Sequence, residues 1–152
     1  MLKGKLVLIT LFLMLGLMLI PQNAEAGDLW YGWQNTTGFY GASVVYNMSD
    51  SLAVQGIVSW NRIGGRGLFR FMKEENWNVY GYAGGSLHFI GFRPYMVAGG
   101  AYEFDWRIFG LDLGAVDEIP IDAARTNIEL GVRMSPNFNP YMSFGVGTHF
   151  QF

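Results

Sequence analysis

The chain ends in the sequence SFGVGTHFQF, residues 143–152, in which apolar or aromatic side chains alternate with small or polar ones. The alternating set is Phe144, Val146, Thr148 (weakly apolar), Phe150 and Phe152. This period of two is typical of a β-strand whose two faces meet different surroundings. Untethered chain ends usually fray. A strand that runs to the last residue therefore predicts that this end is held by pairing with another strand.

The other end of the chain has the pattern of a secretory signal peptide. Lys3 and Lys5 precede the uncharged stretch 6–20, and Ala24 and Ala26 are the small residues expected at a signal peptidase site. An uncleaved anchor is the alternative, but this stretch is shorter than the roughly 20 apolar residues of a spanning helix. No cysteine follows it, which excludes lipoprotein processing. We therefore expect a signal peptide over residues 1–26 and one domain over 27–152.

The composition of this domain excludes several classes of protein. Without Lys3, Lys5 and Glu25 it has 8 basic residues (10 − 2) and 11 acidic ones (12 − 1), so no nucleic-acid partner is expected. The absence of cysteine excludes disulfides. Nineteen of the 21 glycines lie outside the signal (21 − 2), without the three-residue period of collagen. The high aromatic content argues against disorder.

Alternation of period two recurs along the domain, whereas no segment has a sustained helical period. We interpret GGRG, residues 64–67, as a turn, and residues 27–37 as an interfacial plug or lead-in, with a further strand as the alternative. The alternation predicts eight strands, over residues 38–48, 52–61, 68–74, 77–89, 95–104, 107–116, 126–134 and 141–152.

The two faces of these segments decide between a soluble and a membrane barrel. One face carries bulky aliphatic residues, with aromatic residues towards its ends, which is typical of a lipid-facing band with aromatic girdles. The other face is mostly Gly, Ser, Asn and Tyr with isolated charges, which suits the filled lumen of a narrow barrel. A soluble barrel would bury the first face instead. The predicted lumen charge network consists of Arg70, Glu74, Glu103, Asp112, Glu129 and Arg133.

The energetics of backbone hydrogen bonds point to a closed barrel. An unpaired backbone group in hydrocarbon costs several kcal/mol, so a β-protein there must close on itself. A tilted strand needs about 9–11 residues to cross a bilayer, and eight such strands use most of the domain. In a closed antiparallel barrel the last strand pairs with the first. The fold class expected is therefore all-β, a closed antiparallel up-and-down transmembrane barrel of about eight strands.

The terminal sequence GTHFQF resembles the C-terminal β-signal of small bacterial outer-membrane barrels. The resemblance implies that Gly147, Phe150 and Phe152 are read by the barrel-assembly machinery. It also implies outer-membrane lipid as surroundings and a monomer as the expected state. One feature departs from the family, because the longest predicted connection, DEIPIDAAR (residues 117–125), falls on the periplasmic side together with both termini.

The sequence offers one candidate for catalysis. Ser86 and His88 share a predicted face and Glu103 lies on the next strand, the residue types that a lipid deacylase would use. A lumen histidine held by polar neighbours is the interpretation we prefer, for His88 and for His149. The glycines of GGRG and AGG lack the helix and lysine of a phosphate loop. No catalytic, cofactor or metal site is predicted.

These observations lead to one functional hypothesis with two alternatives. The chain is expected to be a non-enzymatic barrel of the bacterial outer membrane with a structural, adhesive or surface-interaction role, or with a narrow pore. The first alternative is a lipid A-modifying enzyme that uses Ser86 and His88. The second is a secreted, lipocalin-like binding barrel.

Overall fold

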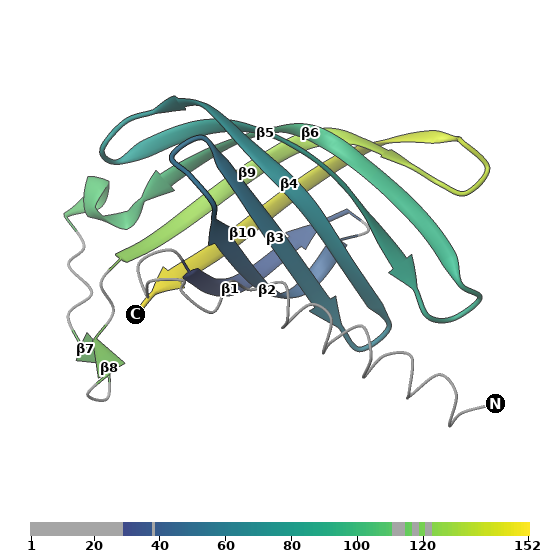
Figure 1. Ribbon diagram of the computed structural model, residues 1–152, viewed down its shortest axis with the longest axis horizontal. Coiled ribbons are helices and arrows are strands. Elements are labelled where there is room, and N and C mark those ends of the chain that lie inside the picture. Colours follow the sequence, from purple (N-terminus) through teal and green to yellow (C-terminus); the bar gives the residue numbers. More distant parts are fainter. Residues whose placement is uncertain (1–28, 38, 111–114, 117–118, 121–122) are drawn as a thin grey trace.

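The computed structural model of the chain describes residues 29–37, 39–110, 115–116, 119–120 and 123–152. Within this part of the chain eight strands close into one barrel, in the order β1-β10-β9-β6-β5-β4-β3-β2 (Figure 1). All neighbours are antiparallel, which confirms the closed up-and-down architecture. The barrel strands are β1 (Leu29–Thr36), β2 (Phe39–Asn47), β3 (Leu52–Ser59), β4 (Arg62–Lys73), β5 (Trp77–His88), β6 (Arg93–Asp105), β9 (Ala123–Met134) and β10 (Pro140–Gln151).

Strand β1 closes the barrel, so the interpretation of residues 27–37 as a plug or lead-in was wrong. Tyr31 pairs with Phe150 of β10 on one side and with Val44 of β2 on the other. The alternation of β1 is weak in sequence because Trp30 lies on its inner face, among residues that are otherwise Gly, Gln and Thr. Pairing with β1, which reaches Phe150, explains why the alternating residues near this end of the chain form a strand, β10, that ends at Gln151.

The predicted strand over residues 107–116 includes residues 111–114, which lie outside the described residues, and it was wrong at residues 107–110. The chain forms a short 3-10 helix there, η2 (Trp106–Phe109), in which the Asp105 carboxylate accepts a hydrogen bond from the backbone N–H of Arg107. Gly110 ends the helix with a φ of 68°, a conformation that favours glycine. Beyond it lies the short antiparallel pair β7 (Ala115–Val116) and β8 (Ile119–Pro120). The barrel thus has the expected number of strands because β1 replaces this segment.

The sequence GGRG does not form a turn, because β4 continues through it. Gly65 pairs with Gly56 of β3 and with Gly85 of β5, and the turn lies earlier, at residues 60–61. A Cβ atom at Gly84 would collide with backbone atoms of Gly65 and Arg66. The glycines therefore let neighbouring strands accommodate Arg66 in the interior.

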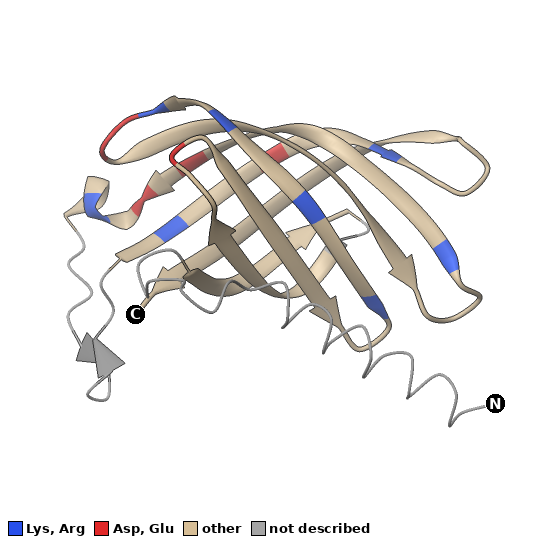
Figure 2. Ribbon diagram, viewed as in Figure 1, with Lys and Arg blue, Asp and Glu red and all other residues tan. Residues whose placement is uncertain are grey.

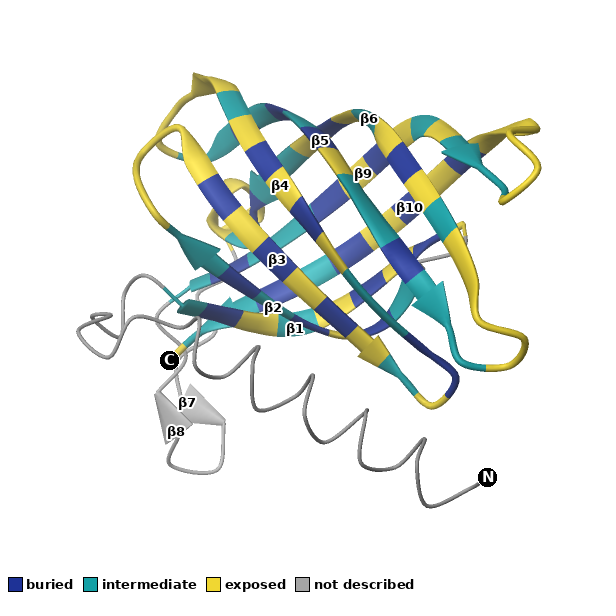
Figure 3. Ribbon diagram, turned by 45° about the vertical axis from the view of Figure 1, so that its right-hand side comes forward, coloured by how far each residue is buried: buried dark blue, intermediate teal, exposed yellow. Residues whose placement is uncertain are grey.

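The two faces of the barrel are oriented as predicted. Buried and exposed residues alternate along each barrel strand (Figure 3). Gly, Ser, Gln, Asn and charged residues occupy most inner positions, together with a smaller set of apolar residues such as Val45, Leu68 and Tyr80. The outer face of the strands bears large exposed hydrophobic residues, among them Trp33, Leu52, Val54, Val58, Phe69, Phe71, Met96, Tyr102, Ile128, Leu130, Val132, Phe144 and Val146.

The two ends of the barrel differ in their connections and charges. One end, here called the terminus end, holds the start of β1, the end of β10 and the connection from β6 to β9. The opposite end, called the far end, has the short connections from β1 to β2, β3 to β4, β5 to β6 and β9 to β10. Acidic residues lie at mid-barrel and towards the terminus end (Figure 2). In the described residues no helix is long and apolar enough to cross a membrane.

Candidate functional site

A buried ion pair lies at the centre of the lumen. Arg66 on β4 donates two hydrogen bonds to the Glu129 carboxylate on β9, at 2.8 and 2.5 Å, and both side chains are 0% exposed. Glu129 also accepts hydrogen bonds from the hydroxyls of Thr36 (2.6 Å) and Tyr80 (3.1 Å). The guanidinium of Arg66 lies 4.6 Å from the ring centroid of Tyr82. This bidentate geometry makes the ion pair strong and fixes its orientation.

Further hydrogen bonds extend this pair into a central network. Arg66 Nε donates to Gln55 at 2.5 Å, and Gln55 donates to Ser43 at 2.6 Å. His149 Nε2 lies 2.8 Å from Ser43 Oγ and 3.2 Å from the Gln55 amide, so this nitrogen accepts. The members of the central network are Gln34, Thr36, Ser43, Gln55, Arg66, Tyr80, Asn127, Glu129 and His149. They come from every barrel strand except β6, so the network fixes the strands around a filled lumen.

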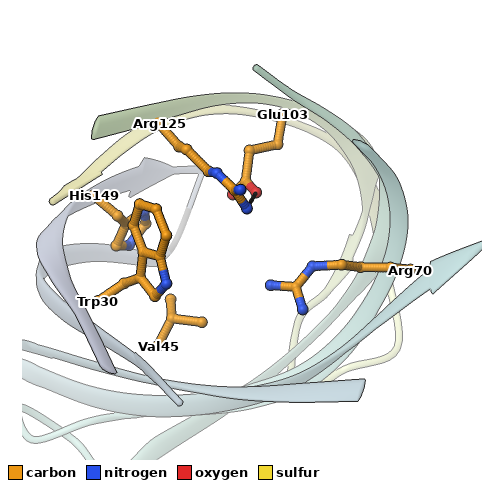
Figure 4. Close-up of a pocket in the computed structure, with 6 residues that line it drawn as sticks. All are labelled: Trp30, Val45, Arg70, Glu103, Arg125 and His149. Carbon is orange, nitrogen blue, oxygen red and sulfur yellow. Dashed lines mark ion pairs between the residues drawn. The ribbon is translucent and has the colours of Figure 1, made fainter. Parts of the chain in front are cut away.

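A small cavity lies between the central network and the terminus end (Figure 4). Arg125 and Glu103 form an ion pair of 3.6 Å on one side of it, and Arg70 projects towards it from the wall that faces Trp30 and His149. Asn78 donates to Glu103 at 2.8 Å. The volume, about 10 Å³, is enough for about one water molecule. Trp30, Val45 and His149 complete the lining. The cavity is too small to bind an organic substrate.

A third polar cluster lies in the lumen at the far end. The guanidinium groups of Arg62 and Arg133 lie 5.4 and 3.9 Å from the ring centroid of Tyr95. The alternation places Tyr40 on the outer face. In the structure the hydroxyl of Tyr40 donates a hydrogen bond to the buried Asn61, and the guanidinium of Arg62 lies over the Tyr40 ring. The structure therefore gathers aromatic and cationic groups at this mouth of the barrel.

The predicted lumen charges are distributed over three separate places. Glu129 belongs to the central network, Arg70 and Glu103 line the cavity, and Arg133 lies in the far-end cluster. Glu74 is exposed in the turn between β4 and β5. Asp112 lies outside the described residues.

Sequence reasoning missed Arg66, the partner of Glu129. Its glycine-rich surroundings, GGRG, were interpreted as a turn. A period-two pattern does run through this segment, since Arg62, Arg66, Leu68 and Arg70 are all on the inner side of β4. Extending the strand backwards through the glycines would have placed Arg66 in the lumen.

The residues of the candidate deacylase site are not assembled. His88 pairs with Arg93, whereas Glu103 pairs with Asn78 near the other end of the barrel. His88 Nδ1 donates to the carbonyl of Ile90 at 3.0 Å, which leaves Nε2 to accept from Asn61 at 3.1 Å. The imidazole therefore has both nitrogens engaged, and Glu103 is not in position to orient it.

Two residues of the proposed assembly signal lie on opposite faces of β10, and Phe152 follows directly after this strand. Phe150 and Phe152 point outward, where their rings lie 5.9 Å from that of Trp106 and 6.4 Å from that of Tyr31. Gly147 faces the lumen, where a Cβ atom would collide with Gln34 and Asn127. The signal peptidase residues Ala24 and Ala26 lie outside the described residues.

Gly147→Ala is expected to lower the free energy of unfolding by about 1–3 kcal/mol, the usual cost of overpacking a close-packed interior. The added methyl group must displace Gln34 and Asn127 and break their hydrogen bond of 3.1 Å. Urea titration followed by tryptophan fluorescence measures the loss. Gly67→Ala is the matched control, because a Cβ there has no atom within 4 Å. Equal stability of the two variants would contradict this role for Gly147.

Comparison with known proteins found no matching family model, no matching curated protein and no matching solved structure. Among the described residues no group of three or more His, Cys, Asp or Glu side chains could hold a metal ion.

Proposed function

We propose that the chain is a non-enzymatic, integral β-barrel protein of the bacterial outer membrane, with a structural, adhesive or surface-interaction role. In this proposal residues 1–26 direct export, and the barrel-assembly machinery reads Gly147, Phe150 and Phe152. The terminus end faces the periplasm and the far end faces outward.

The observation that carries the proposal is the distribution of residues between the two faces. The outer face bears large exposed hydrophobic residues, whereas the interior holds the fully buried Arg66–Glu129 pair. Monomeric soluble proteins seldom expose continuous apolar surface of this extent. In hydrocarbon such a surface is favourable, and the closed strand order leaves no unpaired barrel edge.

The aromatic residues near the terminus end also support a barrel that lies in a membrane. Ring contacts of 5.7 to 6.4 Å connect neighbouring aromatic side chains there. This arrangement matches the aromatic girdle that marks a membrane–water interface. The aromatic set comprises Tyr31, Phe69, Phe71, Trp77, Tyr102, Phe104, Trp106, Phe109, Phe150 and Phe152.

The interior favours a structural barrel over the narrow-pore alternative, because the central network fills the lumen at mid-height. The far-end turns offer surface for interaction instead. Trp60 is 77% exposed and Phe138 is 78% exposed, each in a turn of this end. Exposed aromatic side chains of this kind are common anchors in protein recognition.

The proposal is tested by the fractionation and gel mobility of the expressed chain. We expect the protein in the outer-membrane fraction, and we expect unboiled samples to migrate differently from boiled ones because a closed barrel resists detergent. Gly147→Ala, which weakens the barrel interior, should convert to the unfolded band at a lower temperature than Gly67→Ala. Recovery of folded wild-type protein in the aqueous fraction would overturn the membrane assignment and favour a secreted barrel.

A further inference from the structure

The far-end cluster brings cationic side chains from neighbouring strands to one mouth of the barrel. Arg62 on β4 is directly opposite His88 on β5, which in turn is opposite Arg93 on β6. Directly opposite residues on one face have Cβ atoms about 4.5–5.5 Å apart. Arg133, on β9, reaches the same place through its contact with Tyr95. Three arginines therefore surround this opening.

The charge of this mouth is not balanced by the carboxylates that the structure describes. The guanidinium groups of Arg62 and Arg133 both lie against the ring of Tyr95, so two like charges are close together. Glu129 is bound to Arg66 at mid-barrel, and the other described carboxylates lie towards the terminus end. These others are Asp50, Glu74, Glu75, Glu103 and Asp105.

One donor in the cluster has no partner in the described residues. Arg133 Nε is buried and lacks a hydrogen-bond acceptor. A buried donor without an acceptor costs about 1–3 kcal/mol, more when the group is charged. The guanidinium group lies over the ring of Tyr95, 3.9 Å from its centroid, and this contact limits its movement. A ligand that accepts from this group and reduces the repulsion between Arg62 and Arg133 would lower both penalties.

We propose that the far-end mouth of the barrel binds a phosphate group, with Arg133 and Arg62 as its principal ligands. The proposal goes beyond the structural role given above, and it holds whether the phosphate is a free anion or part of a lipid headgroup.

Phosphate is the ligand class that fits these donors best. Guanidinium groups bind phosphate oxygens through two parallel hydrogen bonds, and such bonds to charged groups are roughly twice as strong as neutral ones. Tyr40 and Tyr95, which lie against Arg62, hold that guanidinium in place before the ligand arrives. Little side-chain entropy is then lost on binding. Arg93 lies at the exposed rim, where its charge attracts an approaching anion.

The first experiment measures stabilisation by inorganic phosphate. The purified folded chain, in dodecyl maltoside if it partitions with membranes and in buffer if it does not, is titrated with phosphate or with chloride at equal ionic strength. We expect phosphate to raise the thermal midpoint in a saturable manner beyond the effect of chloride. Arg133→Gln should weaken apparent phosphate binding about tenfold or more, which corresponds to one charged hydrogen bond. Lys73→Gln, which removes an exposed ion pair at the terminus end, should bind as the wild type does.

Two further measurements are needed. One identifies the source of the phosphate group, and the other replaces Arg133→Gln if that variant does not fold. Where free phosphate has no effect but phosphatidylcholine vesicles doped with phosphatidic acid stabilise the wild type and not Arg133→Gln, the ligand is a lipid headgroup. Arg133→Lys keeps the charge and serves if Arg133→Gln does not fold; it should bind several-fold more weakly, because it lacks the forked donor. Equal effects of phosphate and chloride with no effect of phosphatidic acid, or equal binding by wild type and both Arg133 variants, would overturn the proposal. None of these outcomes depends on where the protein fractionates.

Discussion

Glu129→Ala is expected to lower the free energy of unfolding by about 3–5 kcal/mol, the usual cost of breaking a buried ion pair. The substitution leaves the Arg66 guanidinium charged, without its carboxylate and fully enclosed. It also removes the acceptor of the Thr36 and Tyr80 hydroxyls. Urea titration of the folded protein, followed by tryptophan fluorescence and by gel mobility, measures the change.

Three further variants separate the charge from the packing. Glu129→Gln keeps the size and one acceptor, so a loss nearly as large as that of Glu129→Ala would assign the effect to the unpaired charge on Arg66. The double variant Arg66→Met with Glu129→Met should be less destabilised than the sum of its single variants, because no buried charge remains. Glu74→Gln, on an exposed turn, should change stability by less than about 0.5 kcal/mol. A loss below about 1 kcal/mol for Glu129→Ala would show that water reaches Arg66, contrary to its burial.

The architecture could be predicted from sequence because each barrel strand has two chemically different faces. The alternation in residues 52–61, 77–89, 126–134 and 141–152 appears in the structure with the expected faces inside and outside. Alternation fails as a guide where the inner face itself is apolar or where glycine interrupts it. Trp30 hides the pattern of β1, and the glycines around Arg66 resemble a turn. At residues 107–110 the alternation is outweighed by local hydrogen bonding of Asp105 and by the left-handed Gly110.

The candidate sites could be predicted only in part, because partners depend on strand register. Sequence shows that Glu129 faces inward, but it does not show which strand across the lumen supplies its counter-charge. The pairing with Arg66 follows from the closure of the barrel, in which β4 and β9 are separated by β5 and β6 and their inner side chains meet in the lumen. Likewise, the meeting of Arg62 with Arg133 on Tyr95 joins residues far apart in the chain. The sequence shows the chemistry of each residue, but it does not show which residue lies beside it in the folded barrel.

Leu130→Arg is expected to lower the free energy of unfolding by about 2–4 kcal/mol if the barrel lies in lipid, the cost of an arginine on the lipid face at the bilayer midplane. Leu130 is 58% exposed on the outer face of β9, next in sequence to Glu129 of the central network. It pairs with Gly100 and Phe144, so no charged neighbour on either side could stabilise the guanidinium. Urea titration in phosphatidylcholine vesicles gives the change.

If water surrounds the barrel, the same substitution should leave the free energy of unfolding almost unchanged. It therefore distinguishes sharply between lipid and water as the surroundings of the barrel. An exposed leucine of a soluble protein can be replaced by arginine with a change within about 0.5 kcal/mol, because the side chain enters solvent. Phe138→Arg is the matched control, since Phe138 is 78% exposed in the turn between β9 and β10, beyond the strand ends. A membrane barrel should be destabilised by the first substitution and not by the second. Equal stability of both variants would mean that water and not lipid covers Leu130, and the outer-membrane assignment would then be wrong even though the fold is unchanged.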